Sequence, residues 1–336
     1  MLCARLGSCR LRVFKLPALS VAKVLCVNSG GVVSIVLLHN LLPVIGLVTA
    51  IGAAGLDPDL EPLRIALLEN GADVEVVSWD DDEVEWAYFE AIILRSTWDY
   101  ADRIVEFRAW LDVVDQQTRI VNPFSVVAWS IDKHYLNDLA REGVAVAPMT
   151  FVEVGDVVPS FDPAVEVFVV KPAVGAGSSG GRRCMPNEVA DHVLMLHGMG
   201  HAAIVQPYLE MIDTHGETAL VYLGNGGDLV YDHAFRKSAI LRSTDVELEG
   251  GVLAKEEISD RTANDIERSL AETALSCQSV RALGPLAYAR VDVVPTRNGP
   301  VLLELELVEP SLYFRSSAGS DVRAAQAWLR YIATTA

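Results

Sequence analysis

Residues 288–314, YARVDVVPTRNGPVLLELELVEPSLYF, decide the fold. Two runs of alternating apolar and polar residues flank an Asn-Gly pair, which is typical of a β-hairpin turn. A turn centred near this asparagine places Asp292 opposite Glu304 on the neighbouring strand, and Arg290 opposite Glu306. The other face of the second strand is expected to hold Val301, Leu303, Leu305 and Leu307.

This register gathers three carboxylates on one face of the hairpin, where they would repel each other unless a cation lay between them. Hard divalent ions prefer carboxylate oxygens, and Mg²⁺ commonly binds a few carboxylates together with substrate phosphates. Two ions about 3.5–4 Å apart could use the same acids. We therefore predict that Asp292, Glu304 and Glu306 bind Mg²⁺ or Mn²⁺. The alternative is a solvated acidic face.

A second segment, residues 168–181, reads FVVKPAVGAGSSGG. A strand that ends at Lys171 and enters a glycine- and serine-rich loop suits phosphate binding, because exposed backbone N–H groups can surround an anion. The loop, which includes Gly177 and Ser178, matches neither GxxxxGK[ST] nor GxGxxG. A flexible glycine hairpin is the alternative, but a nucleotide with its metal explains both this loop and the carboxylates.

Two cations, Lys237 and Arg290, lie on or beside strands next to the predicted carboxylate site. Cations placed in this way stabilise the charge of a transferred phosphoryl group. We therefore predict that both residues are catalytic.

The apolar run at residues 91–94 leads directly into Arg95 and a cluster of hydroxyl, aromatic and acidic residues. An open α/β sheet places ligand contacts at this end of its strands. We predict that the planar guanidinium of Arg95 binds a substrate carboxylate. The alternative is an ordinary helix start, with Asp99 or Ser96 as its N-cap and Trp98 in the core.

The chain divides into an α/β part and an α+β part. Residues 44–124 alternate strands and helices and form a first α/β lobe. Residues 125–330 contain strands separated by glycine turns, with two helical segments, and suggest largely antiparallel sheets. The helices are expected at residues 60–69, 104–114, 129–142, 187–196 and 260–282. The strands are expected at 44–50, 74–77, 91–94, 165–170, 204–209, 218–223, 229–235, 286–294 and 301–307.

Composition and charge exclude several classes of protein. A chain of 336 residues that is 51% hydrophobic is a folded, core-rich protein. Its net charge of −18 disfavours a nucleic-acid partner. Five cysteines without a CxxC pair fit neither a disulfide framework nor a cysteine zinc site.

Residues 1–43 form a separate leader in our interpretation, either disordered or preceding the true start of the protein. Residues 24–56 contain no Asp, Glu, Lys or Arg, so length and flanking charge alone would allow a membrane span or signal segment. Asn28, His39 and Pro43 within that run argue against the membrane alternative.

The order of these motifs resembles the ATP-grasp superfamily, the group of glutathione synthetase and D-alanine:D-alanine ligase. The resemblance implies a nucleotide clasped between two α+β lobes, behind an N-terminal α/β lobe. It implies that Lys133 and Lys171 contact ATP, and that the segment containing Gln206 and Tyr208 presents its backbone to adenine, with Asp213 near the ribose. It further implies metal ligands at Asp292, Glu304 and Glu306, the last where many members have Asn, and an arginine at 290 that stabilises the acyl-phosphate and tetrahedral states.

Within the superfamily, residues 94–100, LRSTWDY, look most like the branch that includes the O-ureidoserine cyclo-ligase of cycloserine biosynthesis. Arg95, Glu217 and Ser311 would then contact the substrate. This implies an ATP-dependent carboxylate–amine ligase, acting through an acyl phosphate on an amino-acid-like or small peptide substrate. Ring closure and intermolecular ligation both stay open.

The rival interpretations are a nucleotide-binding regulatory protein without turnover and a membrane-tethered protein. We expect a cytoplasmic location, and formation of a homo-oligomer stays open.

Overall fold

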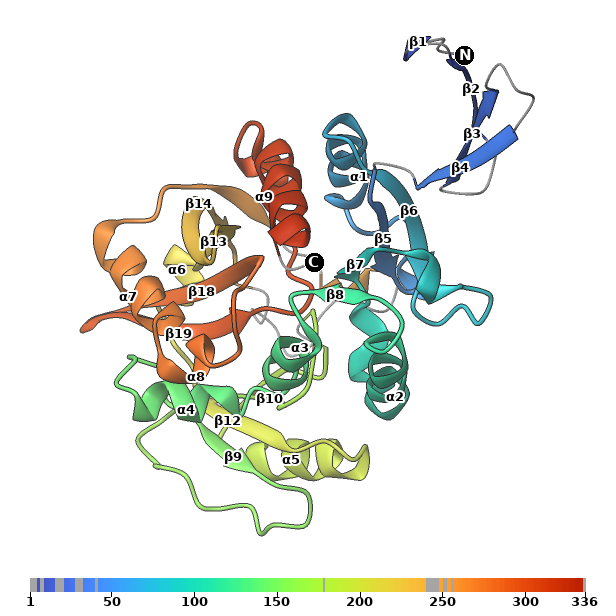
Figure 1. Ribbon diagram of the computed structural model, residues 1–336. Helices are drawn as coiled ribbons and strands as arrows, with labels where there is room; N and C mark the ends of the chain where they lie inside the picture. Colours follow the sequence, from blue (N-terminus) through green and yellow to red (C-terminus); the bar gives the residue numbers. More distant parts are fainter. Residues whose placement is uncertain are drawn as a thin grey trace.

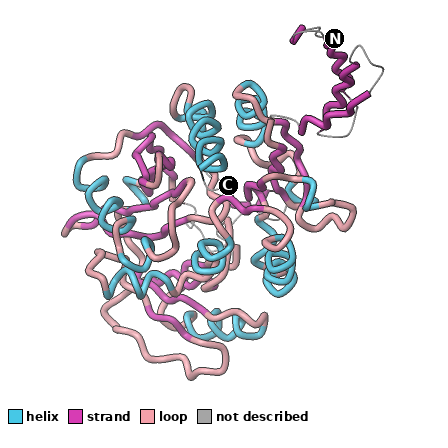
Figure 2. Tube along the Cα trace, in the orientation of Figure 1, coloured by secondary structure: helices cyan, strands magenta, loops and turns pink. Residues whose placement is uncertain are grey.

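The computed structural model describes residues 5–6, 9–15, 21–27, 33–39, 42–177, 179–239, 248–249, 253–254 and 257–334. Three mixed lobes of helices and strands follow one another along the chain from Val44 onward (Figures 1 and 2). The arrangement confirms an α/β lobe followed by two α+β lobes.

The first lobe has a parallel four-stranded sheet in the order β6-β5-β7-β8. Its strands are β5 (Val44–Thr49), β6 (Asp73–Ser78), β7 (Ala91–Ser96) and β8 (Arg119–Val121). Its two long helices, α1 (Leu60–Glu69) and α2 (Ile104–Val114), have the predicted bounds. The short 3-10 helices are η1 (Ile51–Ala53), η2 (Trp86–Tyr88) and η3 (Trp98–Ala101).

Both faces of this sheet are covered. Alternate residues of a strand point to opposite faces, so Ile93 packs with α1 while Ile92 and Leu94 pack with Phe107 of α2. Every residue of β5 and β7 is buried, as expected for parallel strands between two helical layers.

The second lobe is an antiparallel sheet in the order β11-β10-β12-β9. It consists of β9 (Thr150–Val152), β10 (Phe168–Pro172), β11 (Arg182–Cys184) and β12 (Ala203–Pro207), with α5 (Val189–Gly198) packed against it. Strand β10 begins three residues later and ends two residues later than predicted, and the later end brings Lys171 into the strand.

The third lobe has an antiparallel sheet in the order β17-β14-β13-β18-β19. The strands are β13 (Glu217–Asn225), β14 (Asp228–Lys237), β17 (Ile258–Arg261), β18 (Tyr288–Thr296) and β19 (Gly299–Glu306). The remaining elements are α6 (Ile212–His215), β15 (Leu248–Glu249), β16 (Leu253–Ala254), η4 (Phe314–Ser316) and α9 (Ser320–Thr334). Helix α9 contacts both β13 and α1, so one hydrophobic core joins the first and third lobes (Figure 1).

The hairpin of β18 and β19 has the predicted register at the carboxylates, but its turn differs. Thr296 pairs with Gly299, so the loop is Arg297-Asn298, one position before the predicted turn. A β-bulge between Asp292 and Val293 then restores the predicted pairing of Asp292 with Glu304.

The bulge also corrects the predicted apolar face of β19. Leu302 is fully buried, whereas Leu303 is only partly buried. The extra residue reverses the alternation of side chains, so that Leu303 lies on the carboxylate side of the sheet, where it lines a cavity.

Two predicted helices are divided in the structure. The predicted helix 129–142 is α3 (Phe124–Ser130) and α4 (Tyr135–Arg141), and Lys133 lies in the break between them. The predicted helix 260–282 is α7 (Asp265–Leu275) and α8 (Gln278–Arg281). Helix α7 begins late because the Asn264 side chain accepts N–H bonds from the first turn and Glu267 bonds back to Asn264.

The described part of residues 1–43 contains β1 (Arg5–Leu6), β2 (Cys9–Lys15), β3 (Val21–Val27) and β4 (Val33–His39), in an antiparallel sheet of that order. Our interpretation of this segment as a leader, and the boundaries at 44–124 and 125–330, remain predictions. Among the described helices, none is long and apolar enough to cross a membrane.

Candidate active site

A cavity receives side chains from all three lobes. Its charged lining residues are Lys133, Lys171, Lys237, Arg290, Glu304, Glu306 and Glu309. A second cavity shares Lys171, Lys237 and Glu304 with the first, so the two spaces adjoin.

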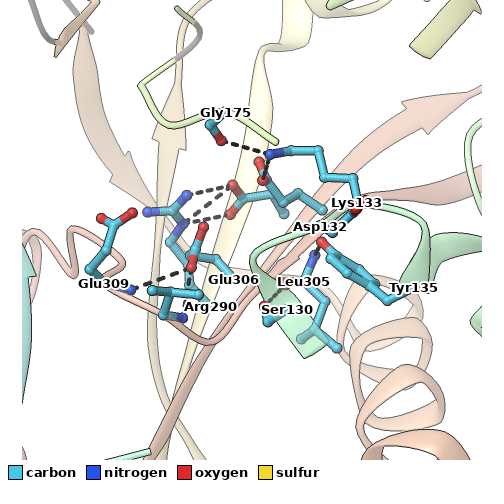
Figure 3. A network of polar contacts seen from close by, with 12 residues as sticks. Ser130, Asp132, Lys133, Tyr135, Gly175, Arg290, Leu305, Glu306 and Glu309 are labelled. Atoms are coloured by element: carbon cyan, nitrogen blue, oxygen red, sulfur yellow. Dashed lines mark hydrogen bonds and ion pairs between the residues drawn. The ribbon is translucent and has the colours of Figure 1, made fainter. Parts of the chain in front are cut away.

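Lys133 and Glu304 form an ion pair between the α3–α4 break and β19. The Lys133 Nζ lies 3.1 Å from Glu304 Oε1 and donates a hydrogen bond of 2.8 Å to the carbonyl of Gly175 (Figure 3). Burial opposes ionisation of Glu304, but the positive charges of Lys133 and Lys171 outweigh it and lower its pKa to about 2. Glu304 is therefore a carboxylate at neutral pH.

Asp292 is fully buried between two cations. Its carboxylate accepts bonds from Arg290 Nε at 2.9 Å and from Lys237 Nζ at 2.7 Å. Burial opposes ionisation, but these two charges hold the pKa of Asp292 below its ordinary value. Lys237 also lies 2.9 Å from Glu217 on β13. Asp292 thereby holds both predicted catalytic cations in place.

Burial and mutual repulsion favour the uncharged forms of Glu306 and Glu309. Burial, followed by the charge of Glu304, raises the pKa of Glu306. Burial, followed by the charge of Glu306, raises the pKa of Glu309 well above its ordinary value. This part of the cavity therefore favours a bound cation.

The three predicted metal ligands do not form one cluster. Within the described ranges, no group of three His, Cys, Asp or Glu side chains converges closely enough to hold a metal ion. Asp292 bonds to cations, whereas Glu304 and Glu306 line the cavity. Two carboxylates that face a phosphate-sized space still fit Mg²⁺, which commonly takes its other ligands from substrate phosphates and water.

The second cavity contains the two residues of the segment that is predicted to face adenine. Gln206 and Tyr208 both line it, and the Nε2 of Gln206 is buried without a hydrogen-bond partner. Asp213 lies outside both cavities and accepts a bond of 2.5 Å from the Tyr208 hydroxyl. The guanidinium of Arg183 lies 3.7 Å from the centre of the Tyr208 ring.

The predicted phosphate loop forms one wall of the first cavity. Lys171 lines both cavities, and burial lowers its pKa despite the nearby charge of Glu304. Gly177 lines the first cavity at a backbone φ of +56°, which favours glycine. Ser178 lies outside the described residues, so its predicted role stays a prediction.

The predicted substrate residues are separated. Ser311 lines the first cavity, and its carbonyl accepts a bond of 3.2 Å from Arg290. Glu217 lines the second cavity. Arg95 lines neither cavity.

Arg95 is buried completely, which contradicts direct contact with substrate in this conformation. Its Nη1 donates a 3.1 Å bond to the carbonyl of Pro310, and its Nη2 lies 3.7 Å from Asp57 and 3.9 Å from Asp59. The Trp328 ring of α9 covers it at 6.0 Å. Arg95 therefore connects the first lobe to the loop after β19. The predicted helix start is also changed, since Thr97 precedes η3 without a side-chain cap.

We expect Arg95→Lys to lower the melting temperature and to impair turnover of ATP and of the amino-acid-like substrate together. Lysine keeps the charge but lacks the planar fork that reaches Pro310 and Asp57. The loss of one charged hydrogen bond corresponds to about 1.5–3 kcal/mol of unfolding free energy. Thermal melts and steady-state kinetics measure both effects, with Arg108→Lys on the exposed face of α2 as the control. An unchanged melting temperature with a raised KM for the amino-acid substrate alone would contradict this prediction.

The sequence patterns did not indicate two residues of the site, Asp59 and Glu309. Asp59, after η1, accepts N–H bonds from Leu312, Tyr313 and Phe314 and so shapes the loop that carries Ser311. Glu309 enters the cavity from the same loop. The Glu-Pro-Ser sequence marks the loop, but no local pattern indicates its partners.

Three lobes around a cavity of lysines, an arginine and carboxylates define a protein of the ATP-grasp class. The family description "D-cycloserine synthetase DcsG, N-terminal domain" matches residues 45–122. The chain is 38% identical over 301 residues to the cycloserine biosynthesis protein DcsG of Streptomyces lavendulae, covering 84% of this chain and 97% of that protein. It therefore belongs to the ATP-grasp superfamily, in the DcsG branch, and is an ATP-grasp ligase.

Solved structures agree with this assignment. The crystal structure of D-cycloserine synthetase DcsG superposes with a TM-score of 0.76 at 35% identity, covering 86% of this chain and 99% of that chain. The ATP-grasp ligase PsnB, complexed with a phosphomimetic variant of its minimal precursor, Mg and ADP, gives a TM-score of 0.56 at 16% identity, covering 86% and 98%. The second likeness shows the shared fold.

Proposed function

We propose that this ligase activates the carboxylate of an amino-acid-like substrate with ATP and joins it to a nitrogen of the same molecule. The observation that carries the proposal is one cavity that combines Lys133, Lys171, Lys237 and Arg290 with carboxylates. Such a site can neutralise phosphates and bind a divalent ion at the same point. The ring-closing form rests on the 38% identity to a cycloserine biosynthesis protein.

The nucleotide would lie across both cavities. The second cavity is the more apolar and offers the unpaired Nε2 of Gln206, which suits a base. Lys171 lies where the two cavities meet, and Lys133 lies in the first, which suits the phosphates. Asp213, which accepts a bond from the Tyr208 hydroxyl, would lie at the edge of the base site.

Two bond exchanges account for the reaction. A carboxylate oxygen of the substrate attacks the γ-phosphorus, the bond to the bridging oxygen breaks, and ADP leaves. The nitrogen then forms a C–N bond to the acyl carbon, the acyl C–O bond breaks, and inorganic phosphate leaves with the proton of the nitrogen. Both steps move negative charge that fixed cations stabilise.

The residues of this chain have separate tasks in that scheme. Lys237 and Arg290, held by Asp292, would stabilise the transferred phosphoryl group and the tetrahedral state. Glu304 and Glu306, which line the first cavity, would hold Mg²⁺. Bound Mg²⁺ supplies charge neutralisation at the phosphates. The glycine-rich loop after β10 would exclude water from the acyl phosphate.

We expect Lys171→Ala to weaken ATP binding by roughly 10- to 100-fold. The reason is that a charged hydrogen bond to phosphate contributes about 1.5–3 kcal/mol. Isothermal calorimetry measures the Kd, and Lys171→Arg, which keeps the charge, should retain most of the affinity. Equal Kd values for the wild type and Lys171→Ala would assign the loop a structural role only.

O-ureidoserine is the first substrate to test. The protein, Mg²⁺ and ATP should release ADP only when O-ureidoserine is added, and equimolar cyclised product should accompany the ADP. Nucleotide binding without ADP release across an amino-acid panel would favour the regulatory alternative instead. A requirement for a second amine would favour intermolecular ligation. A cytoplasmic location, where ATP is available, accompanies the proposal.

A further inference from the structure

The inference concerns Glu309, which follows β19 in the loop to η4. Its side chain lines the first cavity near Trp98 and Ser311, and the residue is only 3% exposed. Figure 3 shows Glu309 beside Arg290, on the side away from Lys133. A carboxyl group so deeply buried stays ionised only with a partner of opposite charge or several hydrogen bonds.

Three of the four cations that line the cavity are already engaged elsewhere. Lys133 pairs with Glu304, while Lys237 and Arg290 bond to Asp292. Across the described part of the chain, no lysine, arginine or histidine forms an ion pair with the Glu309 carboxylate, whose side-chain bond comes from the Tyr100 hydroxyl. The cavity therefore offers one buried acid that a cationic ligand group can pair with.

The loop that carries Glu309 is held rigidly. Arg95 donates to the carbonyl of Pro310, and Asp59 accepts N–H bonds from residues 312–314. The Nε2 of His233 on β14 bonds to the carbonyl of Leu312 at 2.8 Å. These contacts from two lobes fix the position of the Glu309 carboxylate before any ligand binds, which favours a recognition role.

We propose that Glu309 binds the α-ammonium group of the substrate, so that the site selects zwitterionic amino acids over simple carboxylic acids. The inference rests on the proposed function, in which the substrate carboxylate binds on the side of Arg290 and Lys237. A zwitterion then matches the cavity with both of its charges, with its anion toward the cations and its ammonium at Glu309. The Tyr100 hydroxyl and Arg95, through Pro310, act as positioning groups.

The test compares two ligands that differ only in the ammonium group. O-ureidoserine and 3-(ureidooxy)propanoate are assayed for ADP release with the full chain and Mg-ATP. The wild type should prefer the amino compound in kcat/KM by roughly 10- to 100-fold, and Glu309→Gln should remove most of that preference. Glu309→Asp, which keeps the charge, should retain part of it. Glu61→Gln, on the exposed start of α1, is the matched control with an unchanged ratio.

Binding supplies a second readout that does not depend on turnover. Calorimetry with serine and 3-hydroxypropanoate, in the presence of Mg-ADP, should show the same loss of discrimination in Glu309→Gln. An unchanged preference in that variant overturns the inference, as does a shifted Mg²⁺ dependence with unchanged discrimination, which would make Glu309 a metal ligand. If O-ureidoserine drives no ADP release in the wild type, the proposed function fails while the binding comparison still decides the role of Glu309.

Discussion

Glu304→Gln is expected to lower Mg-dependent ATP turnover by about a thousandfold or more. Glu304 is ionised at neutral pH because Lys133 and Lys171 lower its pKa to about 2, so a full negative charge faces the predicted phosphate site. Glutamine has the same shape but no charge. Loss of metal stabilisation of several kcal/mol at the transferred phosphate corresponds to this change, at 1.36 kcal/mol for each factor of ten.

The fold should survive this substitution. Glu304 is partly exposed to the cavity, and glutamine can still accept the bond from Lys133. Circular dichroism should therefore match the wild type, while ADP release at saturating Mg-ATP falls. The melting temperature should fall, because Lys133 and Lys171 lose the negative charge that offsets their own. Glu61→Gln again serves as the control for loss of one acidic charge. Wild-type turnover at saturating Mg-ATP would remove Glu304 from the metal site.

Asp292→Asn is expected to reduce both stability and turnover. Asp292 has no exposed surface, and its carboxylate neutralises Arg290 and Lys237. Breaking a buried ion pair by removing one partner costs about 3–5 kcal/mol, because the remaining charges stay buried without compensation. The two cations would also lose the orientation that the proposed chemistry requires.

Glu217→Gln is a matched control for the stability effect. Glu217 also pairs with Lys237, but its side chain is 15% exposed, so water can replace part of the lost interaction. Chemical denaturation should therefore give a smaller loss of unfolding free energy for Glu217→Gln than for Asp292→Asn. Equal losses of unfolding free energy would show that Asp292 is not the main group that neutralises Arg290 and Lys237.

Local sequence patterns predicted the elements of the site. The alternation around the Asn-Gly turn predicted the pairing of Asp292 with Glu304, although a β-bulge that the pattern does not indicate is needed to keep that pairing. The loop after Lys171 was predicted from its composition, since glycine permits the positive φ that turns require, as at Gly177 and Gly180. Helices α1 and α2 had clear apolar periodicity and were predicted to the residue.

The sequence by itself thus determined the superfamily, the hairpin and most of the cavity lining. Only the tertiary structure decided which charges face ligand and which are neutralised inside the protein. Arg95 and Pro310 are 215 positions apart, and Trp328 of the last helix covers that arginine. Glu309 faces the cavity for the same reason, since contacts from distant elements hold its loop. Burial and ion pairing depend on partners brought together by folding, and no local spacing encodes which partners those are.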